Sequence, residues 1–267
     1  MPCTVAPALP LHQWTVLSLR PRGQHGSLRT AARRRGARVL AASPIAIVPL
    51  DDTRTRATLA AALDAERIVF TSPNAVRAAA KLAPLRARRG QVWLAVGAGT
   101  RRALARAGIT AIAPNRMDSD GLLDLPALSD VRGMRIGLIT APGGRDLLAP
   151  TLTARGAQVL RAHVYARREV ALTARQHAAL AAALHAPRRV LLIASSSEAL
   201  AALLCQVDAA ALRHCAVVAT SARMAEAARA AGFVRVAVAP YPRPSALLDA
   251  AVTAFVAPCR ARQPRRP

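Results

Sequence analysis

One unit recurs along the chain: a short apolar stretch, a turn rich in glycine or hydroxyl side chains, and an alanine-rich helical pattern. The units lie at residues 14–40, 67–83, 92–114, 134–160, 188–204 and 215–240. Short strands that alternate with helices of this length indicate parallel sheets covered by helices on both faces. The sequence therefore predicts an α/β fold.

The last three units resemble a second copy of the first three. The turn TSPNAV at 71–76 falls opposite SSSEAL at 195–200. The glycines that follow helical patterns pair at similar offsets, Gly36 with Gly156 (120 residues) and Gly108 with Gly232 (124 residues). These glycines are typical of helix C-termini. The near-constant offset favours two similar domains that arose by duplication, with chance similarity among alanine- and arginine-rich helices as the alternative.

Two segments fall outside this pattern. Residues 114–133 are polar and contain prolines, which predicts a loop with a short helix at 119–125. Residues 261–267 are basic and proline-rich without apolar periodicity, which predicts a disordered tail.

The composition limits the classes of partner. The formal charge is +24, and a basic protein attracts polyanions in general, so a basic nucleic-acid-binding protein is one alternative. Aromatic residues make up only 3% of the chain, and no zinc-finger, ribonucleoprotein or basic-zipper pattern is present, so nucleic acid is not the expected partner. No apolar run reaches the roughly 18 residues of a membrane span. The four cysteines lack disulfide spacing, and we expect a cytoplasmic protein.

Donor-rich turns follow several of the expected strands. They are Thr71-Ser72 with Asn74, Gly97 to Thr100, Ser195 to Ser197, and Thr220-Ser221. Helix N-termini carry unpaired N–H groups and partial positive charge, and open parallel sheets bind ligands at the carboxyl ends of their strands. A single such turn is most often only a helix cap. Several of them facing one cleft would suit a ligand with many carboxylates.

The remaining motifs do not indicate a cofactor. The stretch VGAGTRRA has Arg102 where a dinucleotide-binding fingerprint has its third glycine, and TAPGGRD lacks the lysine of a P-loop. The six histidines show no metal-ligand spacing. Lys81 is the only lysine and reads as a solvated helix residue, which argues against Schiff-base chemistry. We expect neither a cofactor nor a metal.

An ordered set of motifs resembles the uroporphyrinogen-III synthase family, especially its proteobacterial members. The motifs lie at 69–76, 95–108, 118–128, 143–159, 164–168 and 218–233, and the likeness runs from about Arg20 to Leu248. The resemblance implies two α/β domains joined by a two-stranded connector near 41–50 and 161–170, with the active site in the interdomain cleft. One domain would hold 1–45 with 170–260, and the other 46–169. The duplication alone would divide the chain into simple halves.

The resemblance also implies the reaction. Hydroxymethylbilane would lose water from the hydroxymethyl carbon on ring A, and ring D would attack the resulting electrophile. The spiro intermediate would then fragment and close to uroporphyrinogen III with ring D inverted. The substrate carries an acetate and a propionate on every pyrrole, and hydroxymethylbilane synthase, which supplies it, is a candidate for transient contact. The protein is expected to be a monomer.

The site residues are carried over from the family motifs. Tyr165 is expected to donate a hydrogen bond or a proton to the departing hydroxyl. The residues expected to bind substrate carboxylates are Arg20, Thr71, Ser72, Asn74, Gly97, Thr100, Arg145, Ser195, Ser196, Ser197, Ser221 and Arg223. Two alternatives stay open beside the enzyme: a two-domain protein that binds an anionic small molecule without turnover, and an inactive homologue.

Overall fold

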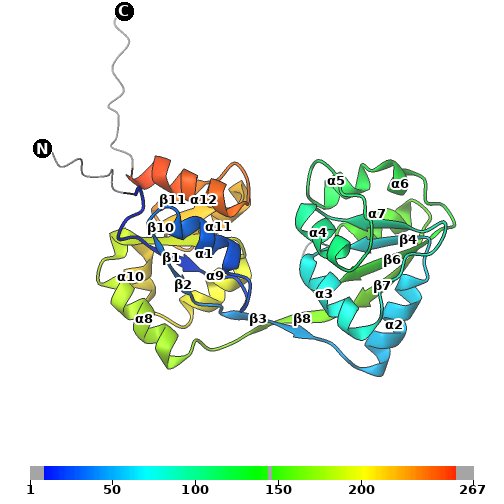
Figure 1. Cartoon of the computed structure of the whole chain (residues 1–267), viewed down its shortest axis with the longest axis horizontal. Helices are drawn as coiled ribbons and strands as arrows, with labels where there is room; N and C mark the ends of the chain where they lie inside the picture. Colours follow the sequence, from blue (N-terminus) through cyan, green and yellow to red (C-terminus); the bar gives the residue numbers. More distant parts are fainter. Residues whose placement is uncertain (1–8, 144–145, 257–267) are drawn as a thin grey trace, which may run out of the picture. The chain divides into compact units, whose positions relative to one another are not determined.

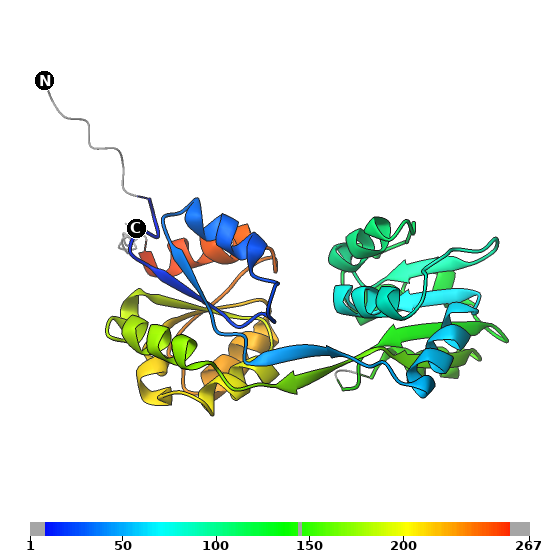
Figure 2. The same cartoon turned by 60° about the horizontal axis from the view of Figure 1, so that its bottom comes forward.

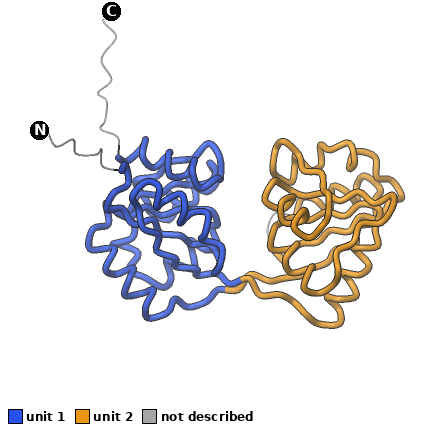
Figure 3. Tube along the Cα trace, in the orientation of Figure 1, with its two compact units in different colours: residues 1–46, 169–267 blue, residues 47–168 orange. Residues whose placement is uncertain are grey.

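The computed structural model describes residues 9–143 and 146–256, and the chain forms two compact units (Figure 3). Unit 1 is made of residues 1–46 and 169–267, and unit 2 of residues 47–168. The division into domains at 1–45 with 170–260 and at 46–169 stays a prediction. The basic tail at 261–267 lies outside the described residues. None of the described helices is long and apolar enough to cross a membrane.

Unit 1 is built on a five-stranded parallel sheet. In spatial order its strands are β11 (Arg235–Val238), β10 (Ala216–Ala219), β9 (Val190–Ala194), β1 (Thr15–Ser18) and β2 (Arg38–Ala41). The three inner strands β10, β9 and β1 are buried along their whole length, which explains their continuous apolar character. All carboxyl ends of the strands therefore meet at one edge of this sheet.

Helices cover both faces of the unit 1 sheet (Figures 1 and 2). On one face lie α1 (Gly26–Arg33) and α12 (Pro244–Ala251). On the other lie α8 (Ala174–Leu184), α9 (Ser197–Leu204) and α11 (Ala222–Ala230). Shorter turns of helix complete the unit at α10 (Ala209–Arg213), η1 (Pro187–Arg189) and η2 (Val252–Val256). The predicted three-layer α/β arrangement is confirmed.

Unit 2 has a four-stranded parallel sheet. Its spatial order is β5 (Val92–Ala95), β4 (Arg67–Phe70), β6 (Arg135–Thr140) and β7 (Gln158–His163), and Ile112 adds a parallel bridge to Leu94 at the β5 edge. One face is covered by α2 (Thr53–Leu63), α3 (Pro73–Leu82) and α4 (Ala98–Arg106). The other is covered by α5 (Ser119–Leu123), α6 (Pro126–Ser129) and α7 (Leu148–Ala154). The short helix expected at 119–125 is α5.

The chain passes between the units through β3 (Ile45–Pro49) and β8 (Tyr165–Glu169), which pair as a two-stranded sheet. The N–H of Leu50 bonds the carbonyl of Val164, and the N–H of Val170 bonds that of Pro44, so the two strands are antiparallel. The two-stranded connector near 41–50 and 161–170 is thus present.

The two sheets share one order of strands. From the bridge at Ile112, the order in unit 2 is β5, β4, β6, β7, and from β11 the order in unit 1 is β10, β9, β1, β2. The glycines paired in the sequence hold matching places: Gly36, Gly108, Gly156 and Gly232 all follow a helix with positive φ. The units differ from simple halves because β1–α1–β2 joins β9, while β6–α7–β7 joins β4.

Three helices of eight or more residues are not predicted by the sequence pattern: α2, α8 and α12. The signals for the first two are present at their starts. Asp52 accepts the N–H of Thr55, and Thr173 and Gln176 form a reciprocal capping box. These caps precede alanine-rich runs with little polar contrast, so periodicity alone did not reveal the helices.

Candidate functional site

The turn after β4 caps a helix without using all of its donors. Ser72 Oγ accepts the N–H of Ala75 at 3.0 Å, and Pro73 fills the first helical position, where no N–H is needed. This cap uses a lone pair of the serine and leaves its hydroxyl proton to be donated elsewhere. Capping therefore explains the sequence of the turn, and one donor remains.

The hydroxyl of Tyr165 lies against that donor. Tyr165 begins β8, its ring belongs to the apolar core of unit 2, and the residue is 3% exposed. Its Oη lies 3.0 Å from Ser72 Oγ. Because Ser72 accepts from Ala75, it can donate to Tyr165, and the tyrosine O–H is then free to donate to a third group. Two predicted site residues 93 positions apart are thus in direct contact.

Thr71 is held by the neighbouring strand. Its hydroxyl donates to Thr140 Oγ1 at 2.8 Å, and its N–H bonds the carbonyl of Ile139. This contact follows from the parallel register, in which Phe70 of β4 pairs with Ile139 of β6. Thr140 was not among the residues predicted from the sequence, although it ends an apolar strand as Thr71 follows one.

The other predicted residues of unit 2 lie at helix starts. Asn74 Oδ1 accepts a hydrogen bond from Arg77 within α3. Gly97 precedes α4 and gives it no side-chain cap; a Cβ there would lie 3.1 Å from that of Met117, so the position is tight. Thr100 is 2% exposed. In α4 the backbone N–H groups of the first turn, more than the threonine hydroxyl, are therefore suited to an anion.

The serine turns of unit 1 repeat the capping geometry. Ser196 Oγ accepts the N–H of Ala199 at 3.2 Å, and Ser221 Oγ that of Met224 at 3.3 Å. The other predicted residues of these turns, Ser195, Ser197 and Arg223, are exposed. By strand order, these turns occupy in unit 1 the places that Ser72 and Gly97 occupy in unit 2.

We expect Ser196→Ala to lower the free energy of unfolding by about 1 kcal/mol, because α9 loses its N-cap. Ser197→Ala is the matched control: this serine is exposed and does not cap, and its loss should change stability by less than about 0.5 kcal/mol. Urea denaturation of both variants measures the difference. Equal stabilities would contradict a capping role for Ser196.

The guanidinium of Arg20 has no ionic partner among the described residues. Arg20 follows β1, is half-buried, and no described residue forms a side-chain hydrogen bond with its guanidinium. Burial lowers its pKa. A half-buried guanidinium without a carboxylate partner is suited to a ligand anion. Arg145, another of the three arginines predicted to bind substrate, lies outside the described residues.

A cavity of about 250 Å³ opens at the carboxyl ends of β4, β6 and β7. Thr71 and Thr140 line it together with Arg161 and His163, and Asp146 pairs with Arg161 at 2.7 Å. Burial lowers the pKa of His163, Arg161 lowers it further, and Asp146 opposes the shift. His163 was not predicted as a site residue. The available signal was its position in the sequence, two residues before Tyr165.

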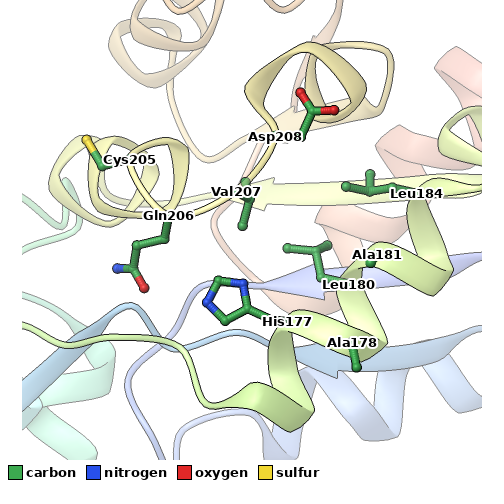
Figure 4. A pocket seen from close by; sticks show the side chains of 9 residues that line it. All are labelled: His177, Ala178, Leu180, Ala181, Leu184, Cys205, Gln206, Val207 and Asp208. Carbon is green, nitrogen blue, oxygen red and sulfur yellow. The ribbon is translucent and has the colours of Figure 1, made fainter.

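The cavity lined by Thr71 belongs to unit 2, and a larger cavity of about 530 Å³ lies in unit 1 (Figure 4). It is lined by α8 and by the segment after α9, with His177, Gln206 and Asp208 among apolar side chains. None of the predicted residues lines it, and it is not at the carboxyl ends of the strands. The smaller cavity is the better candidate for substrate because it contains Thr71 and adjoins the Tyr165 strand.

The described residues contain no group of three or more His, Cys, Asp or Glu side chains able to hold a metal ion. Cys205 and Cys215 are free thiols, and burial raises the pKa of Cys215 to about 12. The predicted residues offer hydroxyl and N–H donors, one tyrosine hydroxyl and the guanidinium of Arg20.

Comparison with known proteins identifies sequence relatives over a short segment and a family over most of the chain. Uroporphyrinogen-III synthases of Salmonella typhimurium (strain LT2) and Escherichia coli (strain K12) are 45% and 43% identical over 53 residues, and the match spans 20% of this chain and 22% of each relative. The family model described as uroporphyrinogen-III synthase HemD matches residues 26–249.

Two solved structures share the fold. A mutant uroporphyrinogen III synthase of Thermus thermophilus is 22% identical, with a TM-score of 0.58, over 88% of this chain and 96% of the other. The uroporphyrinogen-III synthetase of Helicobacter pylori 26695 is 14% identical, with a TM-score of 0.61, over 90% and 99%. At these identities the two structures show a shared fold only. The family is shown by the family model, which matches residues 26–249. The chain belongs to the uroporphyrinogen-III synthase family.

Proposed function

We propose that this protein is a uroporphyrinogen-III synthase that converts hydroxymethylbilane to uroporphyrinogen III. The observation that carries the proposal is the family match over residues 26–249. The geometry of the strand-end turns supports it, because these turns place hydroxyl side chains and helix N-termini, which suit carboxylates, at the carboxyl ends of the strands.

The substrate-binding role is proposed for the turns of both units. The substrate is a polycarboxylate, and each helix N-terminus contributes roughly 0.3–1 kcal/mol to binding an exposed anion. Several such contacts, together with the guanidinium of Arg20, are needed to hold a chain of four pyrroles. We place one of its rings at the cavity lined by Thr71 and Thr140, where hydroxyl donors and a half-buried histidine surround about 250 Å³.

Catalysis is proposed to rest on positioning and on one proton donor. Holding the two ends of the bilane in a spiro-competent geometry lowers the activation barrier by several kcal/mol. Tyr165 would donate to the hydroxyl that leaves ring A, while Ser72 donates to the tyrosine oxygen and stabilises it as it loses proton density. Ring D would then attack the ring A carbon through its substituted position to give the spiro intermediate, which would fragment and close again with ring D inverted and one proton released.

A coupled assay tests the activity. Freshly generated hydroxymethylbilane is incubated with native or heat-denatured protein, and the oxidised isomers are separated. We expect isomer III to dominate with native protein and isomer I with denatured protein. Isomer I alone in the presence of folded protein would refute the synthase activity. In that case tight binding of the bilane without turnover would support the anion-binding alternative.

The cellular context is part of the same proposal. We propose that the protein acts as a monomer in the cytoplasm and receives its substrate in a transient contact with hydroxymethylbilane synthase. The chemistry supports the contact, because hydroxymethylbilane left free closes to isomer I without a catalyst.

A further inference from the structure

A buried histidine joins two loops of unit 1 at the carboxyl end of β1. His25 precedes α1 and is 4% exposed. It occupies the N-cap position, yet its side chain does not cap the helix. The ring instead lies between two serine hydroxyls, with Nδ1 2.9 Å from Ser18 Oγ and Nε2 2.9 Å from Ser43 Oγ.

The hydrogen bond from Ser43 to the backbone determines where the protons lie in this cluster. The hydroxyl of Ser43 donates to the backbone carbonyl of Arg20 at 2.8 Å. A serine hydroxyl has one proton, so Ser43 Oγ must accept from His25 Nε2–H. The other ring nitrogen is then unprotonated and accepts from Ser18. The chain of hydrogen bonds runs one way, Ser18 to His25 to Ser43 to Arg20, and it requires the neutral ring with its proton on Nε2.

The backbone conformation of Ser43 supports a specific role for these hydrogen bonds. Ser43 has φ +48°, a left-handed conformation that residues other than glycine adopt infrequently. This conformation places its hydroxyl between the His25 ring and the Arg20 carbonyl. The hydrogen bonds end at Arg20, whose guanidinium has no partner among the described residues.

We propose that His25 is a positioning residue: through Ser43 its neutral ring holds the backbone of Arg20, and so aims the guanidinium at a carboxylate of the substrate. The role of Arg20 rests on the proposed function, and the hydrogen-bond chain does not. Protonation would make both ring nitrogens donors, and Ser18, which is fully buried, would have to turn its own proton away from the ring. It would also place a third cation beside Arg20 and Arg29.

The charges around His25 set the direction of its pH dependence. Burial lowers its pKa below the ordinary 6.5, and the charged groups that act on the ring, Arg29 and Arg20, lower it further. The folded protein therefore prefers the neutral ring. The hydrogen-bond chain is present at pH 7 and is lost as the pH falls through the folded-state pKa, which lies below the ordinary 6.5.

The first experiment does not depend on activity. NMR of the protein with ¹⁵N-labelled histidine should show His25 as the Nε2–H tautomer at pH 7.5, with a titration midpoint below 6.5. In Ser43→Gly, which removes the hydroxyl but tolerates the left-handed backbone, the His25 signals should shift and amide exchange in residues 19–24 should become at least fivefold faster. A Nδ1–H tautomer, or a midpoint at or above 6.5, would overturn the proposal.

The second experiment separates positioning from simple packing. His25→Gln keeps a donor near Ser43, whereas His25→Asn reaches only Ser18. We expect His25→Asn and Ser43→Gly to raise the KM for hydroxymethylbilane about tenfold with kcat within about twofold, and His25→Gln to retain most of the affinity. His12→Gln, at an exposed histidine of the same unit, is the control. An unchanged KM in both His25→Asn and Ser43→Gly, with only a lower Tm, would reduce His25 to a structural residue.

The two experiments also keep the proposals apart. If no variant, nor the unaltered protein, forms isomer III, the proposed function fails while the tautomer and exchange results still decide the hydrogen-bond chain. If the unaltered protein is active and the tautomer is the wrong one, only the positioning proposal falls.

Discussion

Replacing Tyr165 by phenylalanine is expected to lower kcat for isomer III formation by about a hundredfold, at the lower end of what a general acid contributes. The change removes one oxygen and keeps the ring, which packs in the core of unit 2. The loss in folding free energy should stay near 1 kcal/mol, the value of one hydrogen bond. Activity is thus expected to fall far more than stability.

The reason lies in how the hydroxyl is held. Ser72 accepts from Ala75 and can donate to Tyr165 at 3.0 Å, so the tyrosine proton is free for the departing hydroxyl of the substrate. Phenylalanine leaves that departing hydroxyl without this donor. Substrate carboxylates would still bind to the turns, and KM should therefore change less than kcat.

The chain provides a matched control, because its only other tyrosine is Tyr241, which is 63% exposed. Tyr241→Phe should leave both kcat and KM within about twofold. The measurement is the initial rate of isomer III formation with each protein, alongside thermal unfolding. A Tyr165→Phe protein with kcat within about threefold of the unaltered one would make Tyr165 a packing residue only.

Local sequence signals predicted most of the strands and their turns. Each predicted strand is short and apolar, and the glycines at 36, 108, 156 and 232 adopt the positive φ that ends a helix. The offset between TSPNAV and SSSEAL corresponds to real equivalence, since β4 and β9 hold the same place in their sheets. What the offset did not reveal is that β1 pairs with β9, because pairing between distant strands leaves no local signal.

The candidate site was predicted in part. The serines at strand ends were recognisable from their position before helices, and Ser72, Ser196 and Ser221 do cap. The contact of Ser72 with Tyr165 and that of Thr71 with Thr140 span 93 and 69 residues, so only the folded chain reveals them. The same holds for His25 and Ser43. Carboxylate binding by these residues stays a prediction.

A second large effect is expected at Gly137, on stability. Gly137 is buried in β6 between Ile68 and Leu160 of the neighbouring strands. A Cβ there would overlap the carbonyl oxygen of Ala62 and lie 2.7 Å from its carbonyl carbon. The obstacle is the backbone of α2 rather than a flexible side chain, so the last turn of that helix would have to move. We expect Gly137→Ala to destabilise unit 2 by about 3 kcal/mol or more.

The two tryptophans allow this loss to be assigned to a unit, because Trp93 is buried in unit 2 and Trp14 in unit 1. In a Trp14→Phe background, the tryptophan fluorescence of Gly137→Ala during urea unfolding reports on unit 2 alone. The midpoint should fall strongly relative to the same background without the alanine. Gly26→Ala is the control, because its added Cβ meets nothing within 4 Å and its φ is not positive; it should be neutral or stabilise by up to about 1 kcal/mol. An unchanged Trp93 midpoint in Gly137→Ala would mean that α2 does not lie against this strand.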